Sequence, residues 1–188
     1  MDNKKSYLRK KYILKRRRNF LKSKKFNFNL IFNLIKKHFN KKKITIAGYY
    51  PSNSEVDILK FLEKASKKKF KIVLPVIKSS TGMNYRQWIF QDPLRVNQFG
   101  ILEPIKIKKE MIPDLILVPL VAFDKNLNRI GYGKGYYDRS LKRISKIKKK
   151  SIALGVAYSF QKCNEIPINR FDFKLDYIFT ERGIISSN

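Results

Sequence analysis

One segment constrains the fold of this chain more than any other, because residues 114–121, DLILVPLV, form a nearly continuous apolar run. Such a run is typical of a strand buried on both faces, as the inner strands of a parallel sheet are. Parallel strands are joined by crossovers, usually helices. Hydrophobic periodicity predicts strands at 44–48, 70–74, 85–90, 152–157 and 177–179, and helices at 4–20, 26–39 and 136–147. This alternation indicates an α/β fold with a mostly parallel sheet.

Local signals refine several of these elements. Pro75 follows the strand at 70–74 and is predicted to end it. Ser52 followed by Glu55 is a capping-box pattern, which predicts a helix start just before the apolar stripe of 56–62. The strand at 85–90 is expected to pair antiparallel with its neighbour. Residues 4–20 place Leu8, Tyr12, Lys15 and Asn19 on one stripe, with Ile13, Leu14 and Phe20 nearby, which predicts a basic helix with a narrow apolar face.

The length of 188 residues fits one domain, 1–188, with residues 1–43 as a basic helical segment packed on the rest. The 43% of apolar residues suffices for a real core. No apolar run approaches the ~20 residues of a membrane span, and no signal peptide is recognised. Cys163 is the only cysteine, which excludes an internal disulfide and argues against a cysteine-based zinc site. We therefore expect a monomeric, cytoplasmic protein.

The charge is extreme and uneven. The net charge is +29, and residues 1–43 carry 17 basic side chains against the single acidic Asp2. A polyanion such as RNA, DNA or a membrane surface is one interpretation. Codon bias is the other, because 32 of the 43 basic residues are lysine, whose codons are AT-rich. An RNA-binding protein therefore stays an alternative, and it predicts binding that weakens steeply with salt.

The most informative stretch is NRIGYGKGYYDRSL, residues 128–141, which follows the buried strand and leads into the helix at 136–147. Its three alternate glycines permit positive φ angles and a close approach of backbone to ligand. The helix start offers free N–H groups to an anion, and Arg129 and Lys134 add positive charge. Asp138, one turn into the helix, is placed to hold a divalent cation against a phosphate. These features predict a phosphate site.

The loop does not match a standard nucleotide fingerprint. The Walker A pattern requires Ser or Thr after Gly-Lys, where Gly135 stands, and the Rossmann pattern requires a glycine where Tyr136 stands. By residue type alone, the interpretation of this loop as a turn without a ligand stays open. The basic and acidic residues within the loop favour phosphate binding.

The run GYGKGYYDR resembles the signature of the 5-formyltetrahydrofolate cyclo-ligases, also called 5,10-methenyltetrahydrofolate synthetases. Further motifs typical of that family occur in order along nearly the whole chain. They are Lys5 and Arg9 with the basic run 16–18, Tyr50-Pro51, Glu55, Trp88, FGILEP at 99–104, PDLILVP at 113–119, Phe123-Asp124, Gly155, Ala157, Gln161, Leu175-Asp176 and Thr180-Glu181. The resemblance implies a three-layer α/β/α sandwich of Rossmann-like topology with a mostly parallel sheet.

The resemblance also implies a reaction. In that family ATP phosphorylates the formyl oxygen of 5-formyltetrahydrofolate, the nitrogen at position 10 attacks the activated carbon, and phosphate leaves to give 5,10-methenyltetrahydrofolate. Phosphoryl transfer mainly requires positioning and charge neutralisation. No Ser-His-Asp or Cys-His set is visible in the sequence, which agrees with such a reaction. The implied cofactor is Mg²⁺, with ATP as co-substrate, in a ligase of one-carbon metabolism.

The roles that the resemblance implies fall into four groups. The ATP ligands are Lys5, Arg9, Arg129, Ile130, Gly131, Tyr132, Gly133, Lys134, Gly135, Tyr136 and Tyr137, and Lys134 and Arg129 are the catalytic candidates. The folate contacts are Tyr50, Glu55 and Trp88, joined near the formyl group by Gly133, Lys134, Gly135 and Tyr136, with Tyr85 as a second candidate for stacking. The magnesium ligands are Asp138 and Asp176.

The sequence departs from the family pattern at two places. Tyr132 stands where Arg or a small residue is common, and Phe171 replaces a frequent histidine, beside the retained Asp172. Structural roles compete with each assignment: solvated helix for Lys5 and Arg9, capping for Glu55, surface pairing for Asp176 and core packing for Trp88. His38 and Cys163 are interpreted as structural. An ATP-dependent kinase or ligase of another small molecule stays a second alternative.

Overall fold

The computed structural model describes residues 2–22, 25–40, 43–78, 82–105 and 108–187. The helices are α1 (Asp2–Asn19), α2 (Asn29–Phe39), α3 (Leu59–Lys67) and α4 (Tyr136–Ile147), with short 3₁₀ turns η1 (Phe20–Lys22) and η2 (Ser159–Gln161). The strands are β1 (Thr45–Ala47), β2 (Lys71–Ile77), β3 (Met83–Gln87), β4 (Leu94–Val96), β5 (Leu102–Pro104), β6 (Leu115–Pro119), β7 (Ala122–Phe123), β8 (Arg129–Ile130), β9 (Ile152–Val156), β10 (Tyr177–Thr180) and β11 (Gly183–Ser186).

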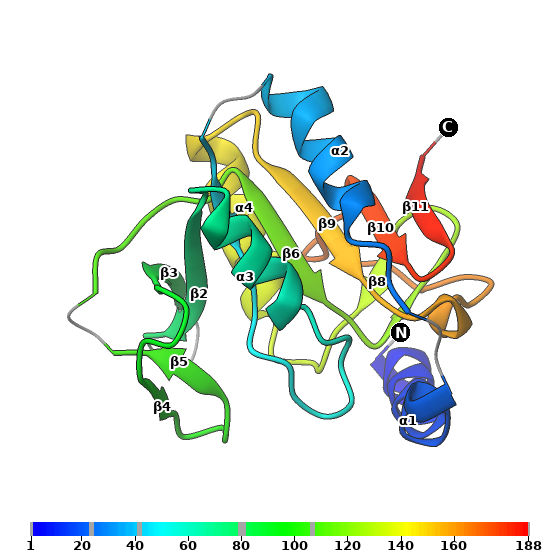
Figure 1. The fold of residues 1–188 in the computed structure, drawn as a ribbon. Coiled ribbons are helices and arrows are strands. Elements are labelled where there is room, and N and C mark those ends of the chain that lie inside the picture. Colours follow the sequence, from blue (N-terminus) through cyan, green and yellow to red (C-terminus); the bar gives the residue numbers. More distant parts are fainter. Residues whose placement is uncertain (1, 23–24, 41–42, 79–81, 106–107, 188) are drawn as a thin grey trace.

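The main sheet has the strand order β11-β10-β9-β6-β1-β2-β3 within the described residues. Its inner neighbours pair in parallel, whereas the edge strands β3 and β11 pair antiparallel. Helices α2 and α3 cover one face and α4 covers the other (Figure 1). The predicted α/β class with a mostly parallel sheet is confirmed.

Strand β6 shows why an unbroken apolar run was needed at the centre. Leu115 and Leu117 pack into the core beneath α2 and α3, and Ile116 and Val118 pack into the core beneath α4. All four are at most 1% exposed. Each face of the strand is therefore covered, which leaves no polar position along it.

The strand order reverses direction between β1 and β6. From β1 the chain proceeds to β2 on one side, and β6, β9 and β10 follow on the other. In open α/β sheets a crevice for ligands forms at such a switch point, beyond the carboxyl ends of the strands. The segments that leave β1 at Ala47 and β6 at Pro119 therefore border the expected site.

Helix α1 stands apart from the two covering layers and packs against β7, β8 and η2, at the carboxyl end of the sheet (Figure 1). Its buried side chains are Tyr12 and Arg16, at 7% and 1% exposure. Tyr12 lies on the predicted stripe, whereas the other buried position of the helix is an arginine, which an apolar face did not predict. No helix among the described residues is long and apolar enough to cross a membrane.

Two local predictions were also wrong. Strand β2 continues through Pro75 to Ile77. The N–H and C=O groups of residues 71 and 73 face β1, so the proline nitrogen faces the same side, beyond the end of β1 at Ala47. No donor is needed there. The Ser52–Glu55 pair forms a turn, with Asn53 and Ser54 at positive φ, and α3 begins only at Leu59.

Candidate functional site

The glycine-rich loop leads directly into α4. Gly133 and Gly135 have φ angles of +97° and +67°, values that residues with a side chain rarely adopt. Gly135 is the N-cap of α4, so no side chain caps the first turn of the helix. The backbone donors at this helix start therefore face the loop without a side-chain acceptor, as an anion site requires.

Arg9 reaches this loop from α1. Its Nε donates to the carbonyl oxygen of Gly131 at 2.9 Å. A Cβ at Gly133 would lie only 3.3 Å from the Arg9 guanidinium carbon. The structure thus brings together two predicted ATP ligands that are more than 120 residues apart in the chain.

Lys5, one turn earlier in α1, pairs with Asp172 at 2.5 Å. The side chains of Lys5 and Asp172 are 13% and 26% exposed, so the pair is largely shielded from solvent. The pair ties α1 to the segment that precedes β10. Asp172, which sequence reasoning retained beside Phe171 without a role, is thus the partner of a predicted ATP ligand.

Arg129 lies beneath the loop, with a side chain only 4% exposed. Its guanidinium donates to Asp138 Oδ1 at 2.8 Å and to the carbonyl oxygen of Phe173 at 3.1 Å. The N–H of Phe173 also donates to Asp138 Oδ1, at 3.0 Å. Arg129 therefore orients the Asp138 carboxylate at the start of α4, and its own charge is already paired.

The structure does not bring Asp138 and Asp176 together. Asp138 lies in the first turn of α4, whereas Asp176 lines a cavity with Lys149 and Lys150, just beyond the last turn. Asp138 and Ile147 are nine residues apart along α4, a separation of about 13 Å at ~1.5 Å for each step. Asp176 Oδ2 instead accepts the N–H of Ala153 at 2.7 Å. The prediction that these two carboxylates share one ion is corrected, because they lie toward opposite ends of the parallel strands.

Lys134 and Tyr136 meet the hairpin of β4 and β5 across the loop. The Lys134 ammonium lies 5.7 Å from the ring centroid of Phe99, and the rings of Phe99 and Tyr136 are 6.1 Å apart. Phe99 is 40% exposed at the tip of the hairpin. The hairpin itself is held by the buried Glu103, whose carboxylate accepts from Arg95 at 2.5 Å and from the backbone of Ile77 at 3.1 Å.

The predicted aromatic contacts separate into two environments. Tyr50 and Trp88 line one cavity of about 370 Å³, together with Phe90 and apolar residues of α3, β4 and β5. Trp88 is 5% exposed and its indole N–H donates to the Asp92 carbonyl at 3.2 Å. Tyr85 is 1% exposed within the core beneath α4, where burial raises its pKa to about 12. The suggestion that Tyr85 stacks on a ligand is therefore corrected.

Glu55 belongs to a polar network that sequence reasoning did not resolve. Its Oε2 accepts the backbone N–H of Ser52 at 2.9 Å. The neighbouring Tyr132 hydroxyl accepts from Arg16. Burial raises the pKa of Glu55, opposed by the Ser52 N–H, the Arg16 charge and the Tyr132 hydroxyl, which lower it.

Arg16 is the functional-site residue that the sequence conceals. It stands within the run Arg16-Arg17-Arg18, where composition indicates solvated charge, yet it is 1% exposed. Its guanidinium donates to the carbonyl oxygens of Leu120, at 3.1 Å, and Asn53, at 2.8 Å. Arg16 thus joins the segments after β1 and β6, on either side of the switch point.

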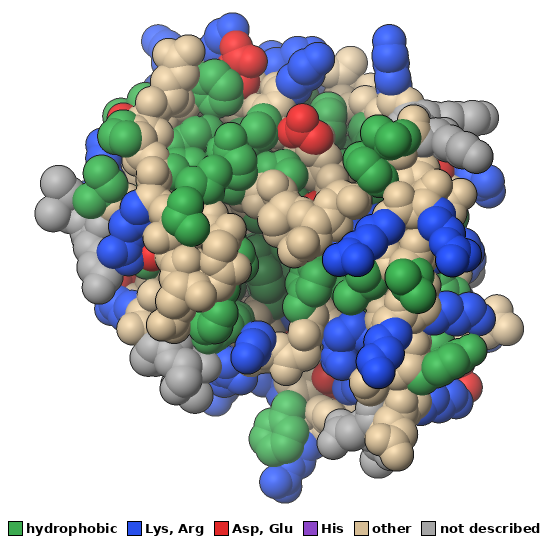
Figure 2. Space-filling view, turned by 90° about the horizontal axis from the view of Figure 1, so that it is seen from below, with side chains coloured by type: hydrophobic (Ala, Val, Ile, Leu, Met, Phe, Trp, Pro, Cys, Tyr) green, Lys and Arg blue, Asp and Glu red, His purple; other side chains and the backbone are tan. Residues whose placement is uncertain are grey.

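Buried polar side chains form hydrogen bonds with the backbone of the segment after β6. Gln161 Nε2 donates to the carbonyls of Leu120 and Val121 at 2.9 and 2.8 Å, and its Oε1 accepts the N–H of Tyr158. Asp124, at 1% exposure, accepts from the backbone of Asn126, Asn128 and Ile166. The face at this end, seen from below, is hollowed near its middle and has Lys and Arg side chains along one side (Figure 2).

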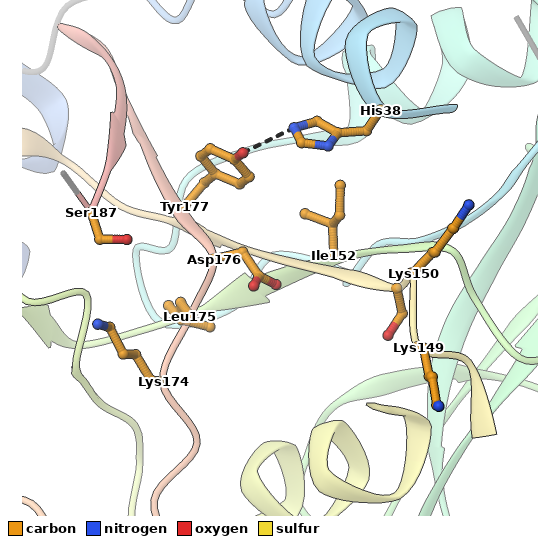
Figure 3. A pocket seen from close by; sticks show the side chains of 10 residues that line it. His38, Lys149, Lys150, Ile152, Lys174, Leu175, Asp176, Tyr177 and Ser187 are labelled. Atoms are coloured by element: carbon orange, nitrogen blue, oxygen red, sulfur yellow. Dashed lines mark hydrogen bonds between the residues drawn. The ribbon is translucent and has the colours of Figure 1, made fainter. Parts of the chain in front are cut away.

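A second cavity, of about 710 Å³, lies at the amino end of the sheet. His38 and Tyr177 point toward one another across it, with 2.9 Å between the imidazole Nε2 and the phenol oxygen (Figure 3). The ammonium groups of Lys149, Lys150 and Lys174 point away from one another (Figure 3). No group of three or more His, Cys, Asp or Glu side chains that could hold a metal occurs in the described part of the chain.

Cys163 is buried at 8% exposure, and its thiol donates to the carbonyl oxygen of Phe123 at 3.3 Å. Burial raises its pKa to about 11, with the Asp124 charge as a second cause. A thiol in such a setting stays protonated near neutrality and is a poor nucleophile.

Comparison with known proteins agrees with this geometry. The model of the 5-formyltetrahydrofolate cyclo-ligase family matches residues 1–181. The chain is 32% identical over 136 residues to the 5-formyltetrahydrofolate cyclo-ligase of Haemophilus influenzae, covering 69% of this chain and 72% of that protein. It is 35% identical over 138 residues to the enzyme of the same name from Mycoplasma pneumoniae, covering 73% of each.

Two solved structures resemble the whole fold. The 5,10-methenyltetrahydrofolate synthetase of Aquifex aeolicus has a TM-score of 0.73 at 32% identity and covers 98% of this chain and 93% of its own. The Mycoplasma pneumoniae synthetase has a TM-score of 0.69 at 28% identity and covers 96% and 99%. With a family model that spans nearly its full length, the chain belongs to the 5-formyltetrahydrofolate cyclo-ligase family.

Proposed function

We propose that this protein converts 5-formyltetrahydrofolate to 5,10-methenyltetrahydrofolate with consumption of ATP, releasing ADP and phosphate. An amide-like formyl oxygen is a poor leaving group, and phosphorylation turns it into a good one. The folate nitrogen at position 10 then attacks the activated carbon, the carbon–nitrogen bond closes the ring, and the phosphate departs with its oxygen. The balance of this step needs no protein nucleophile.

The observation that carries the proposal is the loop 131–135 with Arg9 against it. Uncapped backbone donors at the start of α4 and the guanidinium of Arg9 supply positive potential at one place. Lys134, exposed in the same loop, adds a mobile ammonium for the transferred phosphoryl group. Phosphoryl transfer depends on such positioning and charge neutralisation.

For Mg²⁺, Asp138 is the proposed protein ligand. Its Oδ1 is fixed by Arg129 and by the N–H of Phe173, and its side chain is 23% exposed. Mg²⁺ is commonly held by one or two carboxylates together with substrate phosphates. One oriented carboxylate at the phosphate loop fits this pattern, whereas Asp176 does not fit the same ion. The ion would neutralise charge on the phosphates.

On the folate side we propose Tyr50, Trp88 and Glu55. Tyr50 and Trp88 line a cavity with an apolar majority, suited to a flat ring system. Glu55, half-buried at the turn after β1, offers carboxylate oxygens to hydrogen-bond donors of a pterin edge. All of these groups come from one chain, so the proposed site is complete in a monomer.

The test is direct. The purified protein is mixed with 5-formyltetrahydrofolate, Mg²⁺ and ATP, and the near-ultraviolet absorbance of the methenyl product is followed. We expect a rise that requires ATP and disappears with a non-hydrolysable ATP analogue. A well-folded protein that gives no rise refutes the proposal. Salt-dependent RNA binding is then the next measurement.

A further inference from the structure

Tyr132 occupies a position between the two halves of the proposed site. It lies in the phosphate loop, one residue before Gly133, yet its hydroxyl contacts a side chain from another part of the chain. It accepts from the guanidinium of Arg16, in α1, and the same Arg16 nitrogen also donates to the carbonyl oxygen of Asn53, in the turn after β1 that contains Glu55. Three segments that are distant in sequence therefore meet at one guanidinium nitrogen.

The ring of Tyr132 contributes as well as its hydroxyl. The Arg16 guanidinium lies 5.6 Å from the ring centroid, within the range of a cation–π contact. Arg16 is 1% exposed, and its Nε has no hydrogen-bond partner among the described atoms. A buried cation is costly unless it is compensated. Tyr132 and Glu55 supply part of that compensation, which favours one position of the loop.

Glu55 retains capacity for a ligand in this arrangement. A carboxylate has about four lone-pair sites. The N–H of Ser52 at 2.9 Å and a longer contact from the Ser52 hydroxyl at 3.4 Å account for those seen here. Donors on a folate can therefore be added without displacing either contact, and their binding orders the turn whose Asn53 carbonyl accepts from Arg16.

We propose that Tyr132 is a positioning residue that couples the two substrate sites, so that folate at Glu55 strengthens ATP binding at the loop 131–135 and the reverse. This inference rests on the proposed function. The coupling acts through Arg16: folate at Glu55 orders the turn that contains Asn53, Arg16 joins the Asn53 carbonyl to the Tyr132 hydroxyl, and Tyr132 is part of the glycine loop. Such coupling is reciprocal by thermodynamic necessity.

The test compares Tyr132→Phe with the intact protein. The substitution removes one oxygen and keeps the ring over Arg16. Titration calorimetry measures binding of 5-formyltetrahydrofolate with and without the Mg²⁺ complex of a non-hydrolysable ATP analogue. In the intact protein we expect the analogue to tighten folate binding about tenfold, within the usual range of coupling between sites. In Tyr132→Phe we expect this factor to fall to about one to two, because the oxygen that accepts from Arg16 is lost.

Tyr7→Phe is the matched control. It makes the same chemical change in α1, at a residue 63% exposed that contacts Lys11 through its ring. Its coupling factor should equal that of the intact protein. An unchanged factor in Tyr132→Phe overturns the inference and leaves the proposed function intact. Absence of folate binding in the intact protein overturns the proposed function itself.

A second measurement covers the case in which Tyr132→Phe is poorly folded. Amide hydrogen exchange of the intact protein is recorded with folate alone. We expect slower exchange at residues 131–135, although folate contacts the other side of the network. Unchanged exchange there, with folate bound, also overturns the inference.

Discussion

The two ends of the central sheet differ in how their polar residues are held. At the carboxyl end, charged and amide side chains are buried and hydrogen-bonded to backbone groups of other segments, as with Arg16, Gln161 and Asp124. At the amino end, the lysines of the second cavity are exposed and point apart (Figure 3). The first arrangement fixes the geometry of loops, and the second does not.

The larger cavity lies at the amino end, where the polar side chains are less firmly held. The amino-end cavity measures about 710 Å³, whereas the cavity of Tyr50 and Trp88 measures about 370 Å³. Buried polar groups are costly unless they are fully paired, so their presence beside a loop shows that the position of that loop is closely specified. In this molecule, the organisation of polar side chains identifies the functional end better than volume does.

The largest expected difference in activity is between variants of Asp138 and Asp176, the two aspartates that were predicted to hold Mg²⁺. Asp138→Asn should lower kcat by about 100-fold or more, because it weakens the proposed metal ligand beside the phosphate loop. Asp176→Asn, at the amino end, should leave kcat within about threefold. The methenyl absorbance assay measures both. Equal losses in the two variants contradict the division between the ends.

Stability should show the same contrast. Gln161→Leu leaves the carbonyls of Leu120 and Val121 and the N–H of Tyr158 without their partner, so it should cost about 2 kcal/mol or more of unfolding free energy. Lys174→Met, at the exposed cavity, should change it by less than about 0.5 kcal/mol. Urea unfolding compares them. A Gln161 variant as stable as the Lys174 variant would show that the buried network is dispensable.

Gly131 and Gly133, which lie in the same loop, test whether the loop is shaped for a ligand. Gly133→Ala places a Cβ at φ +97° and 3.3 Å from Arg9, whereas Gly131 has no atom within 4 Å of an added Cβ and no positive φ. We expect the KM for ATP to rise about tenfold in Gly133→Ala, roughly 1.4 kcal/mol. It should stay within about twofold in Gly131→Ala. Similar effects at both positions would argue that the loop is not shaped for a ligand.

The smallest effect concerns pH. The pKa of Glu55 is raised in the folded protein, so its carboxyl group binds a proton more tightly there than in the unfolded chain. Its stabilising contribution is therefore present below about pH 4.5 and is lost as the pH rises through the raised value. Relative to the intact protein, Glu55→Gln should gain stability as the pH is increased. Melting temperatures from acid to neutral pH provide the comparison, and a shift in the other direction contradicts it.

The regular elements were predictable, and the contacts between distant segments were not. Helix α4 spans the predicted residues Tyr136–Ile147, because its amphipathic pattern and the preceding glycines are local signals. The burial of Arg16 depends on carbonyls of Leu120 and Asn53, which no local pattern reveals. The separation of Asp138 from Asp176 depends on the sheet topology, because Asp138 lies at the start of α4 and Asp176 directly precedes β10. The continuation of β2 through Pro75 depends on where its neighbour β1 ends.

Photocrosslinking with an azido-adenine ATP analogue tests most directly which end of the sheet binds the nucleotide. The protein is irradiated with the analogue, Mg²⁺ and folate, and the labelled peptides are identified by mass spectrometry, with excess ATP as competitor. The account predicts labelling that ATP suppresses within α1 or the segment 129–139. ATP-sensitive labelling confined to residues 148–152 or 174–187 would contradict it.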